Sequence, residues 1–457
     1  MPSLTRRAAA GALVLAGLGA TAAARAGTGP ANGTGSAQAG AGDPPRDWID
    51  PDTGHRVIRL SDEPGSASLY FHQNAYLPDG RTLLITTPGT ISAVDLETRA
   101  IRPIIRGEGL TLLFAGRRTG DFYFTRTPPD DGASQPFPKT VYAASAATGA
   151  ERTIGTIPSG SIGSINADET LLLGQWAERD MALQPNATRG RDGRFDQAAY
   201  AATWPDGTPM TFADAKEVRL NDRLEARIPM EIFTLDVQTG ERRIVHRATD
   251  WLNHLQFSPT DPGQIMFCHE GPWHKVDRIW TIRTDGSGLT RVHARTMNME
   301  IAGHEWFSSD GQTIWYDLQT PRGQKFTVAG YDLQTGARTH YHLERDEWSV
   351  HFNSSHDGAL FAGDGGDAEM VARARDGKWL YLFRPEAIPD VAGLHAPNAA
   401  DLIRPGIFRS ERLVNMAAHD YRLEPNITFT PDNRWIVFRS NMHGANHVYA
   451  VEVAKAA

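Results

Sequence analysis

Short strands of alternating hydrophobic and polar residues recur in pairs, seven times between Tyr76 and Ala457. Each pair has a strand with a Pro, Asp or Gly turn and a second strand that ends in a charged turn. Examples are FSSDGQTIWY at 307–316 and VAGYDLQTGARTHY at 328–341. Alternation with a period of two predicts half-buried antiparallel strands. Regular repetition of such pairs is typical of a β-propeller. We therefore expect an all-β fold, a seven-bladed β-propeller over residues 45–457.

Two segments depart from this repeat. The early strand HRVIRLSD at 55–62 has no hairpin partner. We expect it to join the last blade, which closes the ring and removes an open sheet edge. The second departure is a polar, arginine-rich insertion at about 176–229, in which LNDRLEARI at 220–228 predicts a short helix. Long insertions are often functional, so this one is either a lid over an axial site or a solvated loop.

The N-terminus has the pattern of an export signal. Thr5-Arg6-Arg7 precedes an Ala-rich apolar run, and Ala24-Arg25-Ala26 resembles a cleavage site. This pattern predicts a twin-arginine-type signal peptide over residues 1–26, and hence a periplasmic or secreted protein. A membrane anchor is the alternative, but the run is short for a span. Residues 27–44 are rich in Gly, Ala, Thr and Ser and predict a disordered linker.

Composition narrows the possible partners. The net charge is −8 and no basic run occurs, which argues against nucleic acid as a partner. A single cysteine, Cys268, excludes an intramolecular disulfide and disfavours a cysteine-based metal site. No apolar stretch after residue 26 is long enough to span a bilayer. We expect a monomer.

Histidines gather just before the strands that carry the turns. They are His72, His254, His269, His304, His351 and His419. A single histidine at a strand end is more often structural than functional. Several at similar positions of different blades should converge on the propeller axis. Imidazole together with nearby carboxylates suits a divalent cation such as Mn²⁺, Zn²⁺ or Ca²⁺.

Four stretches from Trp251 onward resemble a known family. They are FCHEGP with VDRIW, then GHEWF, then SVHF with GDGGD, and finally PNITFTPD. These motifs are similar to those of oligogalacturonate lyase, polysaccharide lyase family twenty-two. The resemblance extends over roughly residues 45–455. It implies a seven-bladed propeller that splits uronide chains by β-elimination.

The resemblance also implies catalytic roles. The family's catalytic histidine lies in T-H-E-F-W, which matches His304, and its catalytic arginine in D-A-R-M-W, which matches Arg278. A manganese ligand of the family matches His351. We expect His304 to act as general base, with Glu305 orienting its ring, and Arg278 to hold the substrate carboxylate.

The remaining metal ligands of the family are altered in this chain. The family stretch Q-x-x-H-P-H-P-S-F-T-P reads here YRLEPNITFTP, so that the family's glutamine becomes Tyr421 and its two histidines become Glu424 and Asn426. We expect His351, Glu424 and Asn426 to hold a divalent metal, Mn²⁺ or Ca²⁺, because oxygen donors favour harder cations. The alternative is a metal-free site in which Tyr421, Arg422 and Glu424 form hydrogen bonds.

These features predict a lyase that cleaves oligogalacturonate-type glycans and leaves a 4,5-unsaturated uronate. Its partner would be an acidic oligosaccharide. The expected substrate-binding residues are His72, His254, His269, Tyr421 and Arg422. Three alternatives remain open: a lyase on glucuronate-containing glycans of the ulvan or rhamnosyl-glucuronate type, a non-catalytic TolB-like binding propeller, and a glycosidase, which needs a pair of carboxylates.

Overall fold

The computed structural model describes residues 44–127, 138–179, 203–210, 212–368, 370–390 and 396–456. The chain divides into two compact units, Met1–Pro44 and Pro45–Ala457. The predicted signal peptide and linker, and most of the predicted insertion, lie outside the described residues. Within the described part, no helix is both long and apolar enough to cross a membrane.

After two strands at its N-terminal end, the unit Pro45–Ala457 continues with mostly antiparallel strands in chain order. The first strands are β3 (Thr82–Thr87), β4 (Thr90–Asp95) and β5 (Ile101–Arg106); then β6 (Leu110–Ala115), β7 (Asp121–Arg126), β8 (Lys139–Ser145) and β9 (Glu151–Ile157); then β10 (Ser161–Ile165), β11 (Leu171–Ala177), β12 (Met230–Asp236) and β13 (Arg242–Ala248). The middle strands are β14 (Trp251–Phe257), β15 (Gln264–Glu270), β16 (Ile279–Arg283) and β17 (Thr290–Arg291); then β18 (Ile301–Phe307), β19 (Thr313–Gln319), β20 (Phe326–Asp332) and β21 (Arg338–Leu343).

The remaining strands complete the unit. They are β22 (Phe352–Ser354), β23 (Phe361–Gly363), β24 (Trp379–Ala387) and β25 (Arg404–Asn415); then β26 (Thr428–Phe429), β27 (Trp435–Ser440) and β28 (His447–Lys455), with β1 (Asp47–Ile49) and β2 (His55–Arg59) from the N-terminal side. Two short 3₁₀ helices, Arg345–Glu347 and Ala399–Asp401, lie in the connections.

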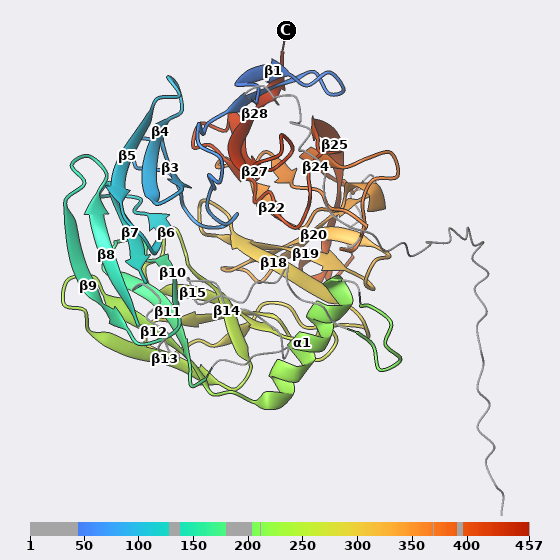
Figure 1. Cartoon of the computed structure of the whole chain (residues 1–457). Helices are drawn as coiled ribbons and strands as arrows, with labels where there is room; N and C mark the ends of the chain where they lie inside the picture. Colours follow the sequence, from blue (N-terminus) through green and yellow to red (C-terminus); the bar gives the residue numbers. More distant parts are fainter. Residues whose placement is uncertain are drawn as a thin grey trace, which may run out of the picture. The chain divides into compact units, whose positions relative to one another are not determined.

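The described strands form six hydrogen-bonded sheets arranged around a centre (Figure 1). One sheet has eight strands, because β21 pairs in parallel with β25. Divided at this parallel pair, the strands form seven antiparallel groups. The predicted all-β propeller is therefore confirmed. The division into seven blades is our interpretation of the hydrogen-bonded pairs. The first group has three strands because Tyr76 forms only an isolated bridge, to Leu83.

The N-terminal strand closes the ring, as predicted. β2 pairs antiparallel with β28, so that Val57 lies opposite Val451, and β1 pairs with the outer side of β2. In Figure 1 the blue N-terminal strands therefore lie beside the red C-terminal ones. This pairing covers the edge of β28, which would otherwise expose a row of unpaired backbone groups.

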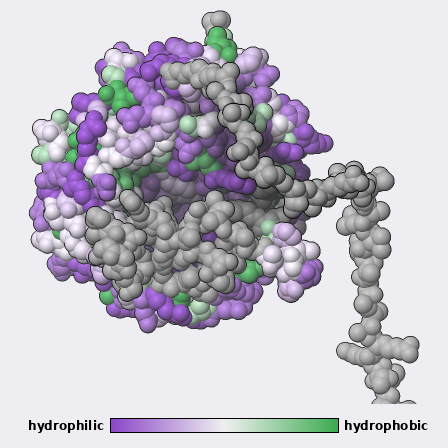
Figure 2. Space-filling view, viewed as in Figure 1, coloured by the Kyte–Doolittle hydropathy of each residue, from purple (hydrophilic) through white to green (hydrophobic). Residues whose placement is uncertain are grey.

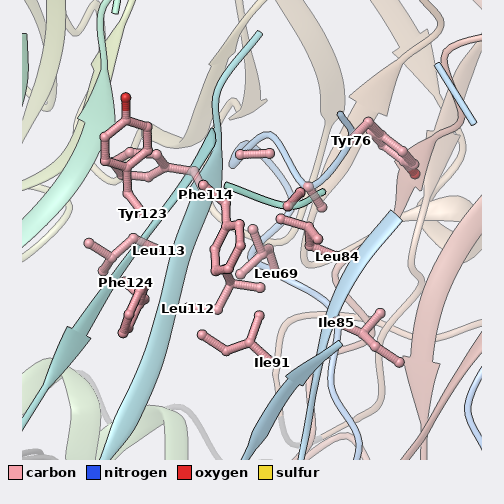
Figure 3. Close-up of a cluster of buried hydrophobic side chains, with 14 of the residues drawn as sticks. Leu69, Tyr76, Leu84, Ile85, Ile91, Leu112, Leu113, Phe114, Tyr123 and Phe124 are labelled. Atoms are coloured by element: carbon pink, nitrogen blue, oxygen red, sulfur yellow. The ribbon is translucent and has the colours of Figure 1, made fainter. Parts of the chain in front are cut away.

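Buried hydrophobic residues fill the space between neighbouring sheets. The largest cluster joins the first groups of strands, where Leu84 and Ile91 pack near Leu112 and Phe114 (Figure 3). Alternation along each strand places these residues on the faces that adjacent sheets share. The visible described surface is mostly hydrophilic, with small scattered hydrophobic patches (Figure 2).

A helix occurs where a short one was predicted, but with different bounds. Helix α1 spans Phe212–Ala226, so it begins before residue 220 and ends before 228. Arg227 adopts a left-handed conformation with φ of 47°, which ends the helix at Ala226, three residues before Pro229. Arg223 stacks over Trp251, with its guanidinium carbon 4.5 Å from the ring centre. The helix is thereby fixed against the start of β14.

Candidate functional site

Irregularities in two strands direct histidines away from the regular strand pattern. In β14 the pairing register shifts between Asn253 and Gln256, and in β18 it shifts between Gly303 and Trp306. His254 and His304 occupy these bulges, each three residues before the end of its strand. His254 also has a positive φ of 49°. β-Bulges change the direction of side chains and are common at functional sites.

The structure brings four of the six predicted histidines together. Ring centroids lie 4.6 Å apart for His304 and His351, 5.8 Å for His254 and His304, and 5.9 Å for His72 and His254. Tyr70 joins them, with its ring 5.1 Å from that of His351. We call these five residues the histidine cluster. Tyr70 is not among the residues predicted from the sequence, although it lies two residues before His72.

The other two histidines lie elsewhere. His419 is buried and bonded on both ring nitrogens, 2.9 Å from Ser440 Oγ and 2.7 Å from the Leu423 carbonyl oxygen. His269 lies beside Asp250, with Nδ1 2.9 Å from a carboxylate oxygen. Its backbone N–H donates to the carbonyl of Arg278, so it supports the strand that carries Arg278. Neither residue makes a ring contact with the histidine cluster.

The carboxylate beside His304 is Asp317 rather than Glu305. His304 Nδ1 lies 3.5 Å from Asp317 Oδ1. Asp317 is on β19, opposite Gly303. A Cβ atom at Gly303 would lie 2.4 Å from Asp317 Oδ1, so only glycine leaves room for this carboxylate.

Glu305 is engaged by the predicted catalytic arginine. Arg278 Nε donates to Glu305 Oε2 over 3.0 Å, and both side chains are almost fully buried. A buried guanidinium requires a counter-charge, which explains why Glu305 does not orient His304. Arg278 Nη2 has no hydrogen-bond partner among the described residues. This nitrogen is the donor that an anionic ligand could use.

Burial sets the charges of the cluster. It lowers the pKa of His72 to about 3, and together with Arg278 it lowers the pKa of His254 well below its ordinary value. Both imidazoles are therefore neutral near pH 7. Burial also raises the pKa of Asp317 to about 6, although Arg278 and His351 oppose this shift. The positive charge at the site comes from Arg278, which remains protonated.

His351 is oriented by Asp364. The Asp364 carboxylate accepts hydrogen bonds from the backbone N–H of His351 and lies 2.8 Å from its Nδ1. The other ring nitrogen, Nε2, lies 3.2 Å from the Tyr70 hydroxyl and 3.8 Å from Glu424 Oε2. His351 and Glu424, two of the three predicted metal ligands, therefore face each other.

The other residues from the altered ligand stretch are not placed as ligands beside this pair. Asn426 Oδ1 accepts from the backbone N–H of Phe71 at 3.3 Å. Tyr421 is buried, and its hydroxyl donates to the Asp364 carbonyl oxygen. Arg422 is exposed. Among the described residues, no group of three or more His, Cys, Asp or Glu side chains is arranged to hold a metal. The donors His351 and Glu424 fit a cation whose other ligands are water or substrate.

Comparison with known proteins identifies the family. The model of a family described as oligogalacturonate lyase matches residues 221–457, slightly more than half of the chain. The chain belongs to the oligogalacturonate lyase family. The matched region contains His254, Arg278, His304 and His351.

Two curated members of the oligogalacturonate lyase family are similar to this chain. The oligogalacturonate lyase of Dickeya dadantii (strain 3937) is 27% identical over 229 residues, which cover 49% of this chain and 55% of that protein. The oligogalacturonide lyase of Pectobacterium atrosepticum is 27% identical over 234 residues, with the same coverage. The chain thus matches about half the length of these relatives.

Solved structures extend the likeness over most of the fold. An oligogalacturonate lyase in complex with manganese has a TM-score of 0.66 and 22% identity, covering 90% of this chain and 96% of that one. The oligogalacturonate lyase of Vibrio parahaemolyticus has a TM-score of 0.65 and 21% identity, with the same coverage. These structures and this chain share one fold.

Asp317→Asn should change how stability depends on pH. A pKa raised from 3.8 to about 6 means that the folded state binds this proton more tightly than the unfolded chain. The protonated Asp317 therefore stabilises the folded state. This stabilisation is complete below about pH 4 and is lost as pH rises through about 6. Relative to Asp317→Asn, the wild-type protein should therefore lose about 1–2 kcal/mol of unfolding free energy between about pH 5 and pH 7.5. Urea unfolding of both proteins measures this difference. Parallel pH profiles would contradict the assignment.

Proposed function

We propose that this protein is a lyase that cleaves uronic-acid-containing oligosaccharides of the oligogalacturonate type by β-elimination. The observation that carries the proposal is the arrangement of His304 and Arg278. His304 lies in the histidine cluster beside Asp317, and Arg278 has a buried N–H without a partner among the described residues. This arrangement occurs in a chain of the oligogalacturonate lyase family.

The proposed reaction needs a base and a positive charge. Elimination removes the proton at C5, forms the C4–C5 double bond and breaks the bond from C4 to the glycosidic oxygen. The C5 proton is acidified by the adjacent carboxylate only when that carboxylate is neutralised, which is the role of Arg278. His304 takes the proton. The Asp317 carboxylate, 3.5 Å from Nδ1 of His304, favours a proton on that nitrogen, so that Nε2 would act as the base.

The neutral histidines complete the proposed site. His72 and His254 would bind substrate hydroxyl groups by hydrogen bonds, because burial keeps both uncharged. The leaving oxygen takes a proton from water or from the Tyr70 hydroxyl. We further propose that the protein is exported, on the basis of residues 1–26 alone.

A panel of pectic, glucuronan and ulvan-type oligosaccharides tests the reaction and its substrate. Elimination creates a conjugated double bond that absorbs in the ultraviolet, whereas hydrolysis yields new reducing ends without that absorbance. We expect absorbance to rise with oligogalacturonate. A rise only with a glucuronate-containing glycan would reassign the substrate. Reducing ends without absorbance would overturn the lyase assignment, and binding without cleavage would favour a binding propeller.

His304→Ala should lose about 10²–10⁴-fold in turnover with little change in melting temperature, because it removes the general base from an otherwise intact site. Arg278→Lys keeps the charge but loses the planar guanidinium, and we expect a similar loss. His419→Ala is the control: it removes a buried hydrogen-bonded imidazole and should lower the melting temperature with near-normal turnover in the folded fraction. Normal elimination by His304→Ala would assign the base to another residue.

We propose in addition that a divalent cation, Mn²⁺ or Ca²⁺, binds at His351 and Glu424. Such a cation would share with Arg278 the neutralisation of the uronate carboxylate. Asp364 keeps His351 Nε2 directed at the site, and Glu424 supplies a harder oxygen donor.

Metal content provides the test of this site. Protein purified without added metal should contain a divalent cation by elemental analysis, and His351→Ala and Glu424→Gln should each reduce it. Exposed Asp420, which lies outside the cluster, offers the control variant Asp420→Asn. Metal-free protein whose turnover is unaffected by chelators would show that Arg278 alone neutralises the carboxylate.

A further inference from the structure

A second polar cavity lies where the turns of several sheets converge. Its volume is about 100 Å³. It is lined by Arg117 from the β6–β7 turn, Ser309 from the β18–β19 turn and His356 from the β22–β23 turn. Phe71 and His72 also line it. The segment that carries Tyr70 into the histidine cluster thus also borders this cavity.

The charge that the described lining residues give this cavity is positive. Among the described residues that line it, Arg117 is the one permanent cation and none is aspartate or glutamate. His356 adds no charge near pH 7, because burial and Arg117 lower its pKa. The remaining polar groups are the imidazole of His72, the indole N–H of Trp306, side-chain amides, hydroxyls and backbone.

Carboxylates occur in the nearby turns, but they are held within those turns. Asp310 accepts from Ser308, and Asp357 accepts from Ser355. Asp432 accepts from Thr430 in the same way. None of these three aspartates lines the cavity. The arginine is therefore not neutralised by the wall around it.

Arg117 is exposed to solvent. Within the described part of the chain, no carboxylate lies within ion-pair distance of its guanidinium, and desolvation is the one influence that shifts its pKa, downwards. Other arginines of the fold show what such a pair looks like: Arg126 lies 2.5 Å from Glu151 and Arg283 lies 2.6 Å from Asp261. A guanidinium offers five N–H donors in a plane that matches an oxyanion.

We propose that this cavity binds a small oxyanion, a carboxylate or inorganic phosphate, through Arg117. The volume is well below that of usual ligand pockets, which fits a small anion better than an oligosaccharide. The site is separate from Arg278 and does not depend on the proposed lyase activity.

Calorimetric titration with inorganic phosphate and, separately, with acetate tests this site at constant ionic strength set by chloride. The matched variants are Arg117→Gln and Arg118→Gln. Arg118 is the adjacent exposed arginine and does not line the cavity. We expect the wild-type protein and Arg118→Gln to bind one oxyanion per chain, and Arg117→Gln to bind at least about tenfold more weakly. The anion that binds more tightly shows whether the cavity prefers phosphate or a carboxylate.

Melting temperature gives an independent readout. Phosphate or acetate should raise it for the wild-type protein but not for Arg117→Gln. In chloride alone, Arg117→Gln should melt at the same temperature as the wild-type protein or higher, because it removes an unpaired cation. Equal oxyanion binding by Arg117→Gln and the wild-type protein would overturn the proposal. So would the absence of binding to the wild-type protein at tens of millimolar phosphate and acetate.

Discussion

The pairing of β2 with β28 is the constraint on which the rest of this fold depends. It joins the first part of the propeller to the last and leaves no free edge on β28. A closed ring directs the first strands of successive sheets towards a common centre. Residues as distant in sequence as His72 and His351 can then belong to one cluster, although no local segment brings them together.

Closure alone would not produce the site, because regular strands alternate their side chains between two faces. The bulges at His254 and His304 change that alternation at corresponding places in β14 and β18. At the same place in β18, Gly303 leaves room for Asp317. Desolvation by the surrounding blades then makes His72 and His254 neutral, while the buried Arg278–Glu305 pair keeps one guanidinium N–H available. The packing of neighbouring blades around the bulged strands therefore determines both the backbone geometry and the electrostatics of the site.

The sequence predicts the strands and the convergence of His72, His254, His304 and His351, because alternation and repeat position are local properties of the chain. It does not predict which carboxylate lies beside His304. Glu305 is adjacent in sequence, but Asp317 reaches the ring across a strand pair whose register depends on the bulge. The C-terminal bound of helix α1 was also missed, because a left-handed residue at Arg227 has no clear sequence signal.

The altered ligand stretch shows how this chain uses positions that hold metal ligands in the motif it resembles. Tyr421 donates to the Asp364 carbonyl, and the backbone N–H of Asn426 donates to the Asp364 carboxylate over 3.2 Å. Asn426 also accepts from Phe71. Asp364 thereby links His351 to the last group of strands, and Asn426 links that group to the segment of Tyr70 and His72. Tyr421 and Asn426 therefore support the histidine cluster through hydrogen bonds to Asp364 and Phe71. Asp364 in turn determines where His351 points, because its carboxylate lies 2.8 Å from Nδ1 of that ring.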